Sequence, residues 1–165
     1  PLFRETLPPA QRRPRARLIS VADGYFDTLQ PNDGVLFTEF DPACVRHENG
    51  VQTTGNPAKP LGEISALGCA DQFELGYYRY DDRLRGRRFP LVDEERGLVL
   101  AAGFIDHAGR LGSYTLTDGR KVDSFIRRPH TFYLLELFKI RDGKILQIEA
   151  AFTTVPYHMP SPWDP

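Results

Sequence analysis

The strongest structural signal in the chain lies in residues 130–155, which read HTFYLLELFKIRDGKILQIEAAFTTV. The two apolar runs in this stretch are rich in aromatic and β-branched residues, which is typical of strands. They are separated by Asp142 and Gly143, a dipeptide whose backbone matches the twist of a two-residue hairpin turn. The sequence therefore predicts an antiparallel hairpin of two long strands.

Further strands are predicted on the N-terminal side of this hairpin. Their segments are bounded by turn residues and read CVRHENG (44–50), RRFPLVD (87–93), LVLAAGFID (98–106) and SYTLT (113–117). The strands around Ala101 and Leu134 are apolar on both faces, which indicates a sheet that is covered on both sides. A homo-oligomer that pairs two sheets back to back would cover the second face, and so would one of the Pro-rich ends of the chain.

Helices are predicted in the first half of the chain. Apolar residues recur at helical spacing from Leu18 to Leu29, which predicts a helix of about four turns beginning near Arg15. A short second helix is predicted over residues 35–40 and a third over residues 66–80. Helices followed by a run of strands indicate an α+β fold, with the helices packed on one face of a curved antiparallel sheet.

The composition is that of one globular domain. The chain has 165 residues, of which 41% are hydrophobic and 26% are charged. We assign the domain to residues 14–155, between a Pro-rich arm at residues 1–13 and a Pro-rich tail at residues 156–165. No apolar run is long enough to span a membrane, and the N-terminus lacks the apolar core of a secretion signal. We therefore expect a cytoplasmic protein without a membrane partner.

Charge and cysteine content exclude further classes of function. The formal net charge is -1, although 17 of the 21 basic residues are arginine. Five arginines fall within residues 79–88, but Asp81 and Asp82 interrupt them, and this balance disfavours a nucleic-acid partner. Cys44 and Cys69 lack the spacing of metal ligands, so the sequence predicts two reduced, buried thiols and no metal site.

The order of the expected elements resembles the nuclear transport factor 2-like superfamily. The resemblance covers about residues 14–155 and is carried by the element order, by ADGYFDTL (22–29) in the first helix and by LFKIRDGKILQIEA (137–150) at the last hairpin. It implies a cone in which helices close a curved sheet over a pocket. Members include ketosteroid isomerase, scytalone dehydratase, limonene epoxide hydrolase, SnoaL-type polyketide cyclases and non-enzymatic transport modules, so the fold does not select a reaction.

A second resemblance narrows the expected chemistry. Residues 69–109 are similar to a SnoaL-like group that includes cofactor-independent lyases removing formaldehyde from lignin-derived aryl propanediols. This resemblance implies a small phenolic substrate with two rings and no cofactor. The chain has no Gly-rich phosphate loop, GxSxG elbow or HExxH pair. We expect a cofactor-independent lyase (dehydratase, isomerase or formaldehyde-releasing) acting on a small aromatic molecule; the alternative is a non-catalytic binding or oligomerisation module.

Polar residues embedded in the apolar strands are the candidates for catalysis. Val45 and His47 share one strand face, so an inward Val45 would bring His47 into the pocket as a general acid or base. The alternative is a hydrogen-bonded or surface histidine. Asp106 and His107 point to opposite faces, and only one of them can face the pocket. An inward Asp106 would pair with His47, whereas an Asp106 at a turn would cap the backbone.

Six further residues are predicted to bind the substrate: Tyr77, Tyr78, Tyr80, Arg88, Phe104 and Glu136. The tyrosines offer phenols and aromatic rings, with core packing as the alternative role. Glu136 lies inside an apolar strand, where it is either paired with Arg46, Arg79 or Arg88 or held protonated as a catalytic acid. Arg88 is expected near the pocket mouth, oriented by Asp93, or else in a surface ion pair.

Overall fold

The computed structural model describes residues 2–163; Pro1 and residues 164–165, at the ends of the predicted arm and tail, lie outside the described residues. Two 3-10 turns at Leu2–Arg4 and Pro9–Gln11 precede the first helix. The elements that follow are α1 (Arg15–Leu29), β1 (Phe40–Glu48), β2 (Val51–Gln52), a 3-10 turn (Glu63–Ala66), α2 (Cys69–Glu74), β3 (Arg83–Asp93), β4 (Leu98–His107), β5 (Ser113–Thr115), β6 (Lys121–Asp123), β7 (His130–Arg141) and β8 (Lys144–Val155).

Six strands form one sheet in the order β2-β1-β8-β7-β4-β3, and β5 pairs with β6 in a separate ribbon. The predicted hairpin is confirmed, because β7 and β8 are antiparallel and Arg141 lies opposite Lys144. Asp142 and Gly143 both have positive φ angles, of 54° and 78°, which a two-residue turn of this kind requires. The strands predicted at 87–93 and 98–106 are present within β3 and β4, and the strand predicted at 113–117 is shorter in the structure, because β5 ends at Thr115.

The α+β class is confirmed, but the prediction of an entirely antiparallel sheet was wrong. β1 runs parallel to β8, with Val45 opposite Gln147 and His47 opposite Glu149. A hairpin signal identifies only strands that follow each other in sequence, whereas β2 to β7 lie between β1 and β8 in the chain. The pairing of β1 with β8 therefore had no local signal. The sheet is therefore mixed, and β1 brings its side chains beside the last strand.

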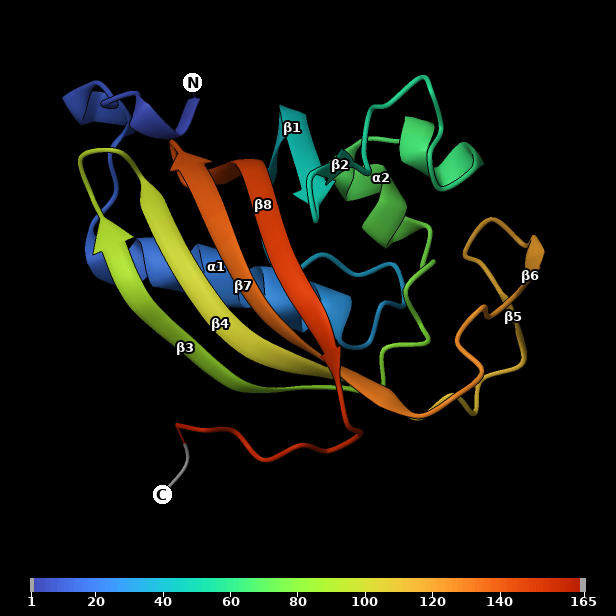
Figure 1. The fold of residues 1–165 in the computed structure, drawn as a ribbon. Helices are drawn as coiled ribbons and strands as arrows, with labels where there is room; N and C mark the ends of the chain where they lie inside the picture. The colour runs from blue at the N-terminus through green and yellow to red at the C-terminus, as the bar shows by residue number, and fades with distance from the viewer. Residues whose placement is uncertain (1, 164–165) are drawn as a thin grey trace.

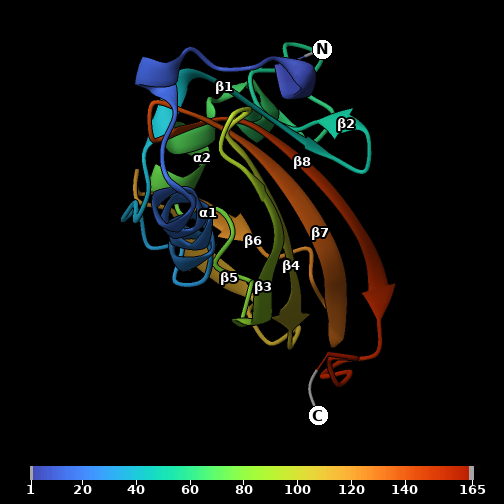
Figure 2. The same cartoon turned by 90° about the vertical axis from the view of Figure 1, so that its left-hand side faces the viewer.

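The sheet curves around α1 and α2 (Figures 1 and 2). The helical spacing read from the sequence is confirmed, since the stripe that α1 turns to the sheet is buried: Leu18, Val21, Ala22, Tyr25, Phe26 and Leu29. These residues pack against inward side chains of β4, β7 and β8, such as Val99, Phe138 and Ile148. Burial of this apolar area is the main stabilising contribution to the fold. The helix side of the sheet is its concave face, and the other side is called its outer face below.

The other helix predictions were less accurate. Residues 35–39 are not helical, because this segment runs along α1, where the amide of Phe37 donates to Thr28 Oγ1. The predicted third helix is only the six residues of α2, preceded by a 3-10 turn and followed by turns up to Tyr80. Gly76 ends it with a φ angle of 70°. A Cβ at this position would lie 3.0 Å from the backbone oxygen of Asn32, so the turn requires glycine.

The prediction of two reduced thiols was wrong. Cys44 on β1 and Cys69 at the start of α2 form a disulfide across 25 residues of sequence. The sequence could not show this pairing, because it depends on where α2 docks against β1. The bond ties the concave side of β1 to α2, and it closes the loop that contains β2 and the 3-10 turn.

Candidate functional site

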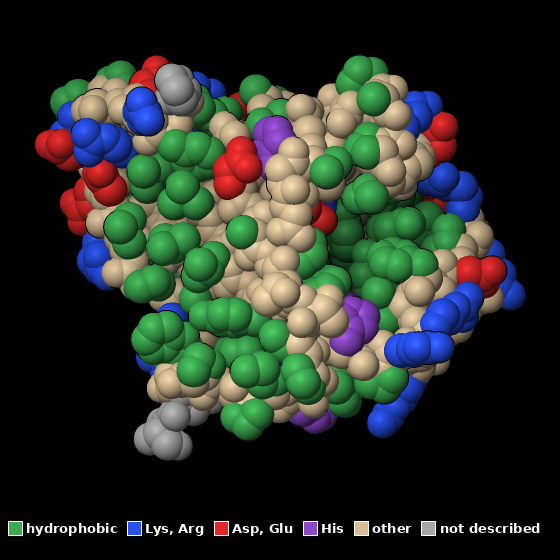
Figure 3. All heavy atoms as spheres, in the orientation of Figure 1, with side chains coloured by type: hydrophobic (Ala, Val, Ile, Leu, Met, Phe, Trp, Pro, Cys, Tyr) green, Lys and Arg blue, Asp and Glu red, His purple; other side chains and the backbone are tan. Residues whose placement is uncertain are grey.

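The concave face of the sheet encloses a cavity of about 410 Å³. It lies between the sheet, the end of α1, the segment from α2 to β3 and the β5–β6 lobe. Figure 3 shows it as a hollow lined mainly by hydrophobic side chains. The lining residues are Tyr25, Leu29, Arg46, Glu48, Leu61, Ile64, Tyr77, Tyr78, Tyr80, Asp81, Ile105, His107, Phe125, Ile126, Phe132, Leu134, Glu136, Ala150 and Phe152. A small-molecule site typically has this size and this apolar character, with a few polar groups.

Four of the predicted site residues line this cavity: Tyr77, Tyr78, Tyr80 and Glu136. The other four, His47, Asp106, Phe104 and Arg88, do not. Each of these four lies on the outer face of the sheet. The strand alternation had been assigned correctly, but the inward face had not.

His47 was predicted as the catalytic acid or base, and the structure contradicts this placement. Its imidazole Nδ1 lies 3.2 Å from Glu149 Oε1, in a partly exposed pair on the outer face. Arg46 and Glu48, its neighbours along β1, point into the cavity instead. The prediction failed because it assumed that the apolar Val45 marks the inward face. The inward Arg46 is instead neutralised by Glu48 on the same strand and is buried with hydrogen-bond partners from α2 and the turns after it.

Asp106 was predicted as the partner of His47, and it too lies outside the cavity. Its carboxylate is completely buried by Arg83, Arg85 and Thr131, which all donate hydrogen bonds to it. Burial alone would raise the pKa of Asp106, but the hydrogen bonds from these three residues lower it to about 2. Asp106 is therefore an ionised structural carboxylate. Phe104, on the same face, stacks on Tyr133 and under Arg85.

Arg88 binds the C-terminal tail and does not lie at the cavity mouth, where it was predicted. Its Nη2 donates to the backbone oxygen of Trp163 at 2.6 Å, and its guanidinium lies near the indole ring. Asp93, the predicted partner of Arg88, instead pairs with Arg96. The C-terminal tail thus covers part of the outer face, which agrees with the expectation that a Pro-rich end of the chain covers the second face of the sheet. Leu135 remains exposed on this face.

The strongest chemical feature of the cavity wall is a buried histidine–carboxylate pair. His107 Nε2 lies 2.9 Å from Asp81 Oδ1, and both side chains are almost completely buried. Burial raises the pKa of Asp81 above its usual range, and the hydrogen bond and charge of His107 partly oppose that rise. With Nε2–H donated to Asp81, the lone pair of the imidazole is on Nδ1. This Nδ1 atom is buried and has no hydrogen-bond partner among the described residues.

Glu136, on β7, supplies a second polar group to the cavity. It lies inside β7 and accepts a hydrogen bond of 3.1 Å from the Tyr25 hydroxyl to Oε1. Its Oε2 atom is buried without a partner among the described residues. Burial raises the pKa of Glu136 to about 8; the charge of Arg46 and the Tyr25 hydrogen bond oppose this shift, and Glu48 adds to it. The structure therefore favours a protonated carboxyl group at Glu136 over a structural ion pair with an arginine.

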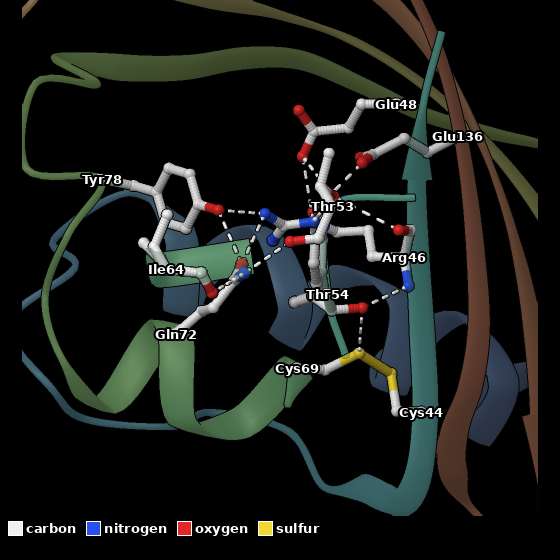
Figure 4. A network of polar contacts seen from close by, with 11 residues as sticks. Cys44, Arg46, Glu48, Thr53, Thr54, Ile64, Cys69, Gln72, Tyr78 and Glu136 are labelled. Carbon is white, nitrogen blue, oxygen red and sulfur yellow. Dashed lines mark hydrogen bonds and ion pairs between the residues drawn. A yellow bond between two sulfur atoms is a disulfide. The ribbon is translucent and has the colours of Figure 1, made fainter. Parts of the chain in front are cut away.

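Arg46 organises the wall between β1 and α2 (Figure 4). Its guanidinium is buried and forms an ion pair of 3.0 Å with Glu48. It also donates to the Tyr78 hydroxyl and, at 3.0 Å, to Gln72 Oε1. Gln72 in turn donates to the backbone oxygens of Thr53 and Ile64. Every charge in this group is matched, so Arg46 fixes the shape of the wall and is not a free cation.

Tyr80 lies beside the histidine–carboxylate pair. Its ring centroid is 6.2 Å from that of His107, and no described residue forms a hydrogen bond with its hydroxyl. Burial is the first cause of a pKa well above the usual range for this phenol, and the charge of Asp81 adds to it. Tyr80 therefore stays protonated and can donate to a ligand oxygen. Phe125 packs edge-on against it at the cavity mouth.

The sequence contained one usable signal for the residues that were missed. His107 was identified as the alternative to Asp106, and the strand alternation placed it on the correct face for the cavity. Asp81 was counted only as a charge that interrupts an arginine cluster. Asp81 is near His107 because the turns after α2 lead the chain back along β4. The spacing of apolar residues in the sequence does not predict this approach.

Among the described residues, no group of three or more His, Cys, Asp or Glu side chains is arranged to hold a metal ion.

Comparisons with known proteins address the family and the fold. A family model described as "Domain of unknown function (DUF8021)" matches residues 11–152. A search of curated proteins finds no match. Among solved structures, a putative isomerase from Bacillus subtilis is similar, with a TM-score of 0.50 and 12% sequence identity over 83% of this chain and 88% of that chain. At this identity the likeness concerns the fold alone. No helix of the described residues is long and apolar enough to cross a membrane.

Proposed function

The chain belongs to the DUF8021 family, and on the geometry of the cavity we propose that it is an acid–base enzyme, a cofactor-independent lyase or isomerase of small aromatic molecules. The observation that carries the proposal is the buried His107–Asp81 pair, with a free Nδ1, on the wall of an apolar cavity of about 410 Å³. An open cavity with polar groups disfavours an oligomerisation module whose cone is filled by its own side chains, and the buried pair of titratable groups favours an enzyme over a module that only stores a ligand. The isomerase description of the Bacillus subtilis neighbour and the nuclear transport factor 2-like resemblance agree with this class.

His107 is the proposed general base. Asp81 accepts the Nε2–H hydrogen bond, which orients the ring and stabilises the imidazolium that forms when Nδ1 takes a proton from a substrate carbon or hydroxyl. Tyr80 donates a hydrogen bond to the substrate oxygen on which negative charge develops. Because both Asp81 and Tyr80 lie next to His107, they act at the same end of the substrate.

Glu136 is the proposed anchor at the other end of the cavity. In register, His107 lies opposite His130, and Glu136 is six residues further along β7, with Phe132 and Leu134 between them on the cavity wall. The protonated Oε2 of Glu136 can donate to a hydroxyl or carbonyl oxygen of the substrate. An aromatic body would then lie against Phe132, Leu134 and the tyrosines.

Three reactions can use this arrangement of groups. In an isomerisation, Nδ1 of His107 takes a proton from the carbon next to a carbonyl, Tyr80 stabilises the enolate oxygen, and the imidazolium returns the proton to another carbon. In an elimination, Nδ1 takes the same proton, the adjacent carbon–oxygen bond breaks, and the departing hydroxide takes this proton from the imidazolium and leaves as water, which restores neutral His107. For an aryl propanediol, the benzylic hydroxyl and the phenolic proton are first lost as water, which gives a quinone methide. His107 then deprotonates the terminal hydroxyl, the carbon–carbon bond breaks to release formaldehyde, and the electron pair of that bond passes into the quinone methide to give a phenolate, which takes the proton back from the imidazolium.

Proton abstraction can be tested before the natural substrate is known. The protein is incubated in D₂O with a panel of aryl ketones, and deuterium incorporation beside the carbonyl is followed by NMR; aryl propanediols are screened in parallel for formaldehyde. Removal of a general base costs about 10²–10⁴ in rate. We expect His107→Ala to slow exchange at least about hundredfold, and the matched variant His47→Ala to leave it unchanged. Equal rates for His107→Ala and the wild type would refute the proposal.

Asp81 is a positioning residue in this scheme, and its test needs more than a rate. Asp81→Asn should lower the exchange rate and also move the pH profile of the reaction, because the amide no longer stabilises the imidazolium. If Asp81 were merely structural, its replacement would lower the rate equally at all pH values.

The homo-oligomer expected from the sequence remains a prediction. The expected cytoplasmic location also remains a prediction, and the Cys44–Cys69 disulfide favours an oxidising compartment instead of the cytoplasm.

A further inference from the structure

The rim of the cavity carries a cluster of basic side chains that the proposed reaction does not use. Arg110 follows β4, and Arg127 and Arg128 precede β7; all three are exposed and are called the rim arginines. None of them forms an ion pair with any described acidic residue. Figure 3 shows Lys and Arg side chains along the right and lower edge of the hollow.

The backbone holds the three rim arginines together. Gly109 has a φ angle of 67°, and a Cβ there would lie 2.8 Å from the amide nitrogen of Arg128 and 3.0 Å from the carbonyl carbon of Arg127. The turn before Arg110 is therefore in direct contact with the segment of the other two arginines. The three positive charges therefore belong to one region of the surface, and a local excess of positive charge attracts anions.

The cluster is attached to the cavity wall on both of its segments. Phe125 and Ile126 line the cavity immediately before Arg127, and His107 lines it three residues before Arg110. The region from His107 to His130 holds five basic and two acidic residues in a chain whose net charge is -1. One of those acids, Asp118, is paired with Arg120, and the other, Asp123, accepts a hydrogen bond from Ser113. The positive charge is thus local to the mouth.

The interior of the cavity has no complementary charge for an anion. Arg46 is the sole Lys or Arg among its described lining residues, and Glu48 already neutralises it at 3.0 Å. Asp81 and Glu136 add acidic groups to the same wall. An anionic group on a ligand would lose its hydration inside without gaining a partner, so it is excluded from the interior and stabilised at the rim.

We propose that the cavity takes amphipathic aromatic anions, whose rings fill the interior while a carboxylate, sulfonate or phosphate group stays at the rim arginines. This inference rests on the proposed use of the cavity as a substrate site, and it adds the charge and the orientation of the substrate. The rim arginines also raise the rate of association, since a local field of this kind steers oppositely charged ligands in a salt-dependent way.

Two fluorescent probes separate the anion from the rings. 1-Anilinonaphthalene-8-sulfonate and N-phenyl-1-naphthylamine share their ring system, and only the first carries a sulfonate. At low ionic strength we expect Arg110→Gln, Arg127→Gln and Arg128→Gln together to weaken binding of the sulfonate probe about tenfold or more, with binding of the neutral probe unchanged. The difference should shrink as salt is added, because the rim is exposed.

A matched control removes the same amount of charge elsewhere. Arg4, Arg15 and Arg17 are exposed and unpaired among the described residues, and Figure 1 shows the N-terminal arm and the start of α1 on the opposite side of the molecule from β5 and β6. Their replacement by glutamine should leave binding of both probes unchanged. Equal weakening by the two triple variants would show a general charge effect and overturn the inference.

The remaining outcomes distinguish this inference from the proposed function. If the neutral probe binds and the sulfonate probe binds no better or is insensitive to the rim variant, the cavity is a ligand site but the anion preference is refuted. If neither probe binds, the proposed substrate cavity and the inference both fail. If a nucleic-acid oligomer binds the rim arginines while the sulfonate probe is unaffected by their loss, the cluster belongs to a polyanion and the inference is refuted.

Discussion

The two faces of the curved sheet treat the same kinds of side chain in opposite ways. On the outer face, Asp106 is surrounded by Arg83, Arg85 and Thr131, and its pKa falls to about 2. On the concave face, Glu136 is buried with Tyr25 as its hydrogen-bond partner, and its pKa rises to about 8. Both carboxyl groups are buried, so burial alone does not set the charge. Hydrogen-bond donors and cations around a buried carboxyl group decide whether it is ionised and structural, as Asp106 is, or protonated and available for chemistry, as Glu136 is.

The histidines show the same contrast. His47 on the outer face is partly exposed and pairs with Glu149, while His107 on the concave face is buried and pairs with Asp81. The lining of the cavity separates the two, because His107 belongs to it and His47 does not. The outer face therefore carries structural ion pairs, and the concave face has the features of a site.

The largest effect is expected from breaking the concave wall at its covalent tie. Replacing both Cys44 and Cys69 by alanine opens a loop of 25 residues and should lower the free energy of unfolding by about 3–4 kcal/mol. Urea denaturation of the wild type with and without reductant, beside the double variant, measures this. A reduced wild type as stable as the oxidised protein would show that β1 and α2 hold together without the bond.

The next effect compares the two buried carboxyl groups directly. Asp106→Asn leaves Arg83 and Arg85 without their anion and should cost about 2–3 kcal/mol in the free energy of unfolding. Glu136→Gln replaces a neutral acid by an amide of the same shape and should cost less than about 1 kcal/mol. Urea denaturation at pH 7 ranks them, and the reverse ranking would mean that the charge states of the two faces are misassigned.

The pH dependence of stability should have opposite signs at these two residues. The pKa of Glu136 is raised in the folded state, so its contribution is fully present below about pH 4.5 and is lost as pH rises towards 8. The pKa of Asp106 is lowered, so its contribution is present above about pH 4 and is lost as pH falls towards 2. Each slope is measured as the difference in stability between the wild type and the corresponding amide variant across pH. A slope of the same sign for both variants would contradict the account.

The sequence predicted the parts of the fold that depend on local pattern. The stripe from Leu18 to Leu29 and the turn at Asp142 and Gly143 report helix and hairpin geometry directly, and both are present. The parallel pairing of β1 with β8 depends on contacts between distant segments. Local periodicity does not encode such contacts.

The site was predicted in part for the same reason. The tyrosines and Glu136 were found because polar groups stand out in apolar segments. The inward face of β1 was misassigned because the apolar Val45 suggested it, and on β4, which is apolar on both faces, the pattern did not decide between Asp106 and His107. Arg46 is buried inward because Glu48 on the same strand pairs with it and because Gln72 and Tyr78, from a distant part of the chain, accept its hydrogen bonds. The pairing of His107 with Asp81 likewise depends on the fold of the turns before Asp81, so the sequence alone does not show it.

The contact between a ligand and the histidine rings tests most directly whether the concave face is the site. The chain has four histidines, so their ring resonances can be assigned by single substitutions and followed by NMR as neutral N-phenyl-1-naphthylamine is added. The account predicts that the resonances of His107 shift, and that those of His47 and His158 on the outer face do not. Shifts confined to His47 or His158, with His107 unchanged, would contradict it.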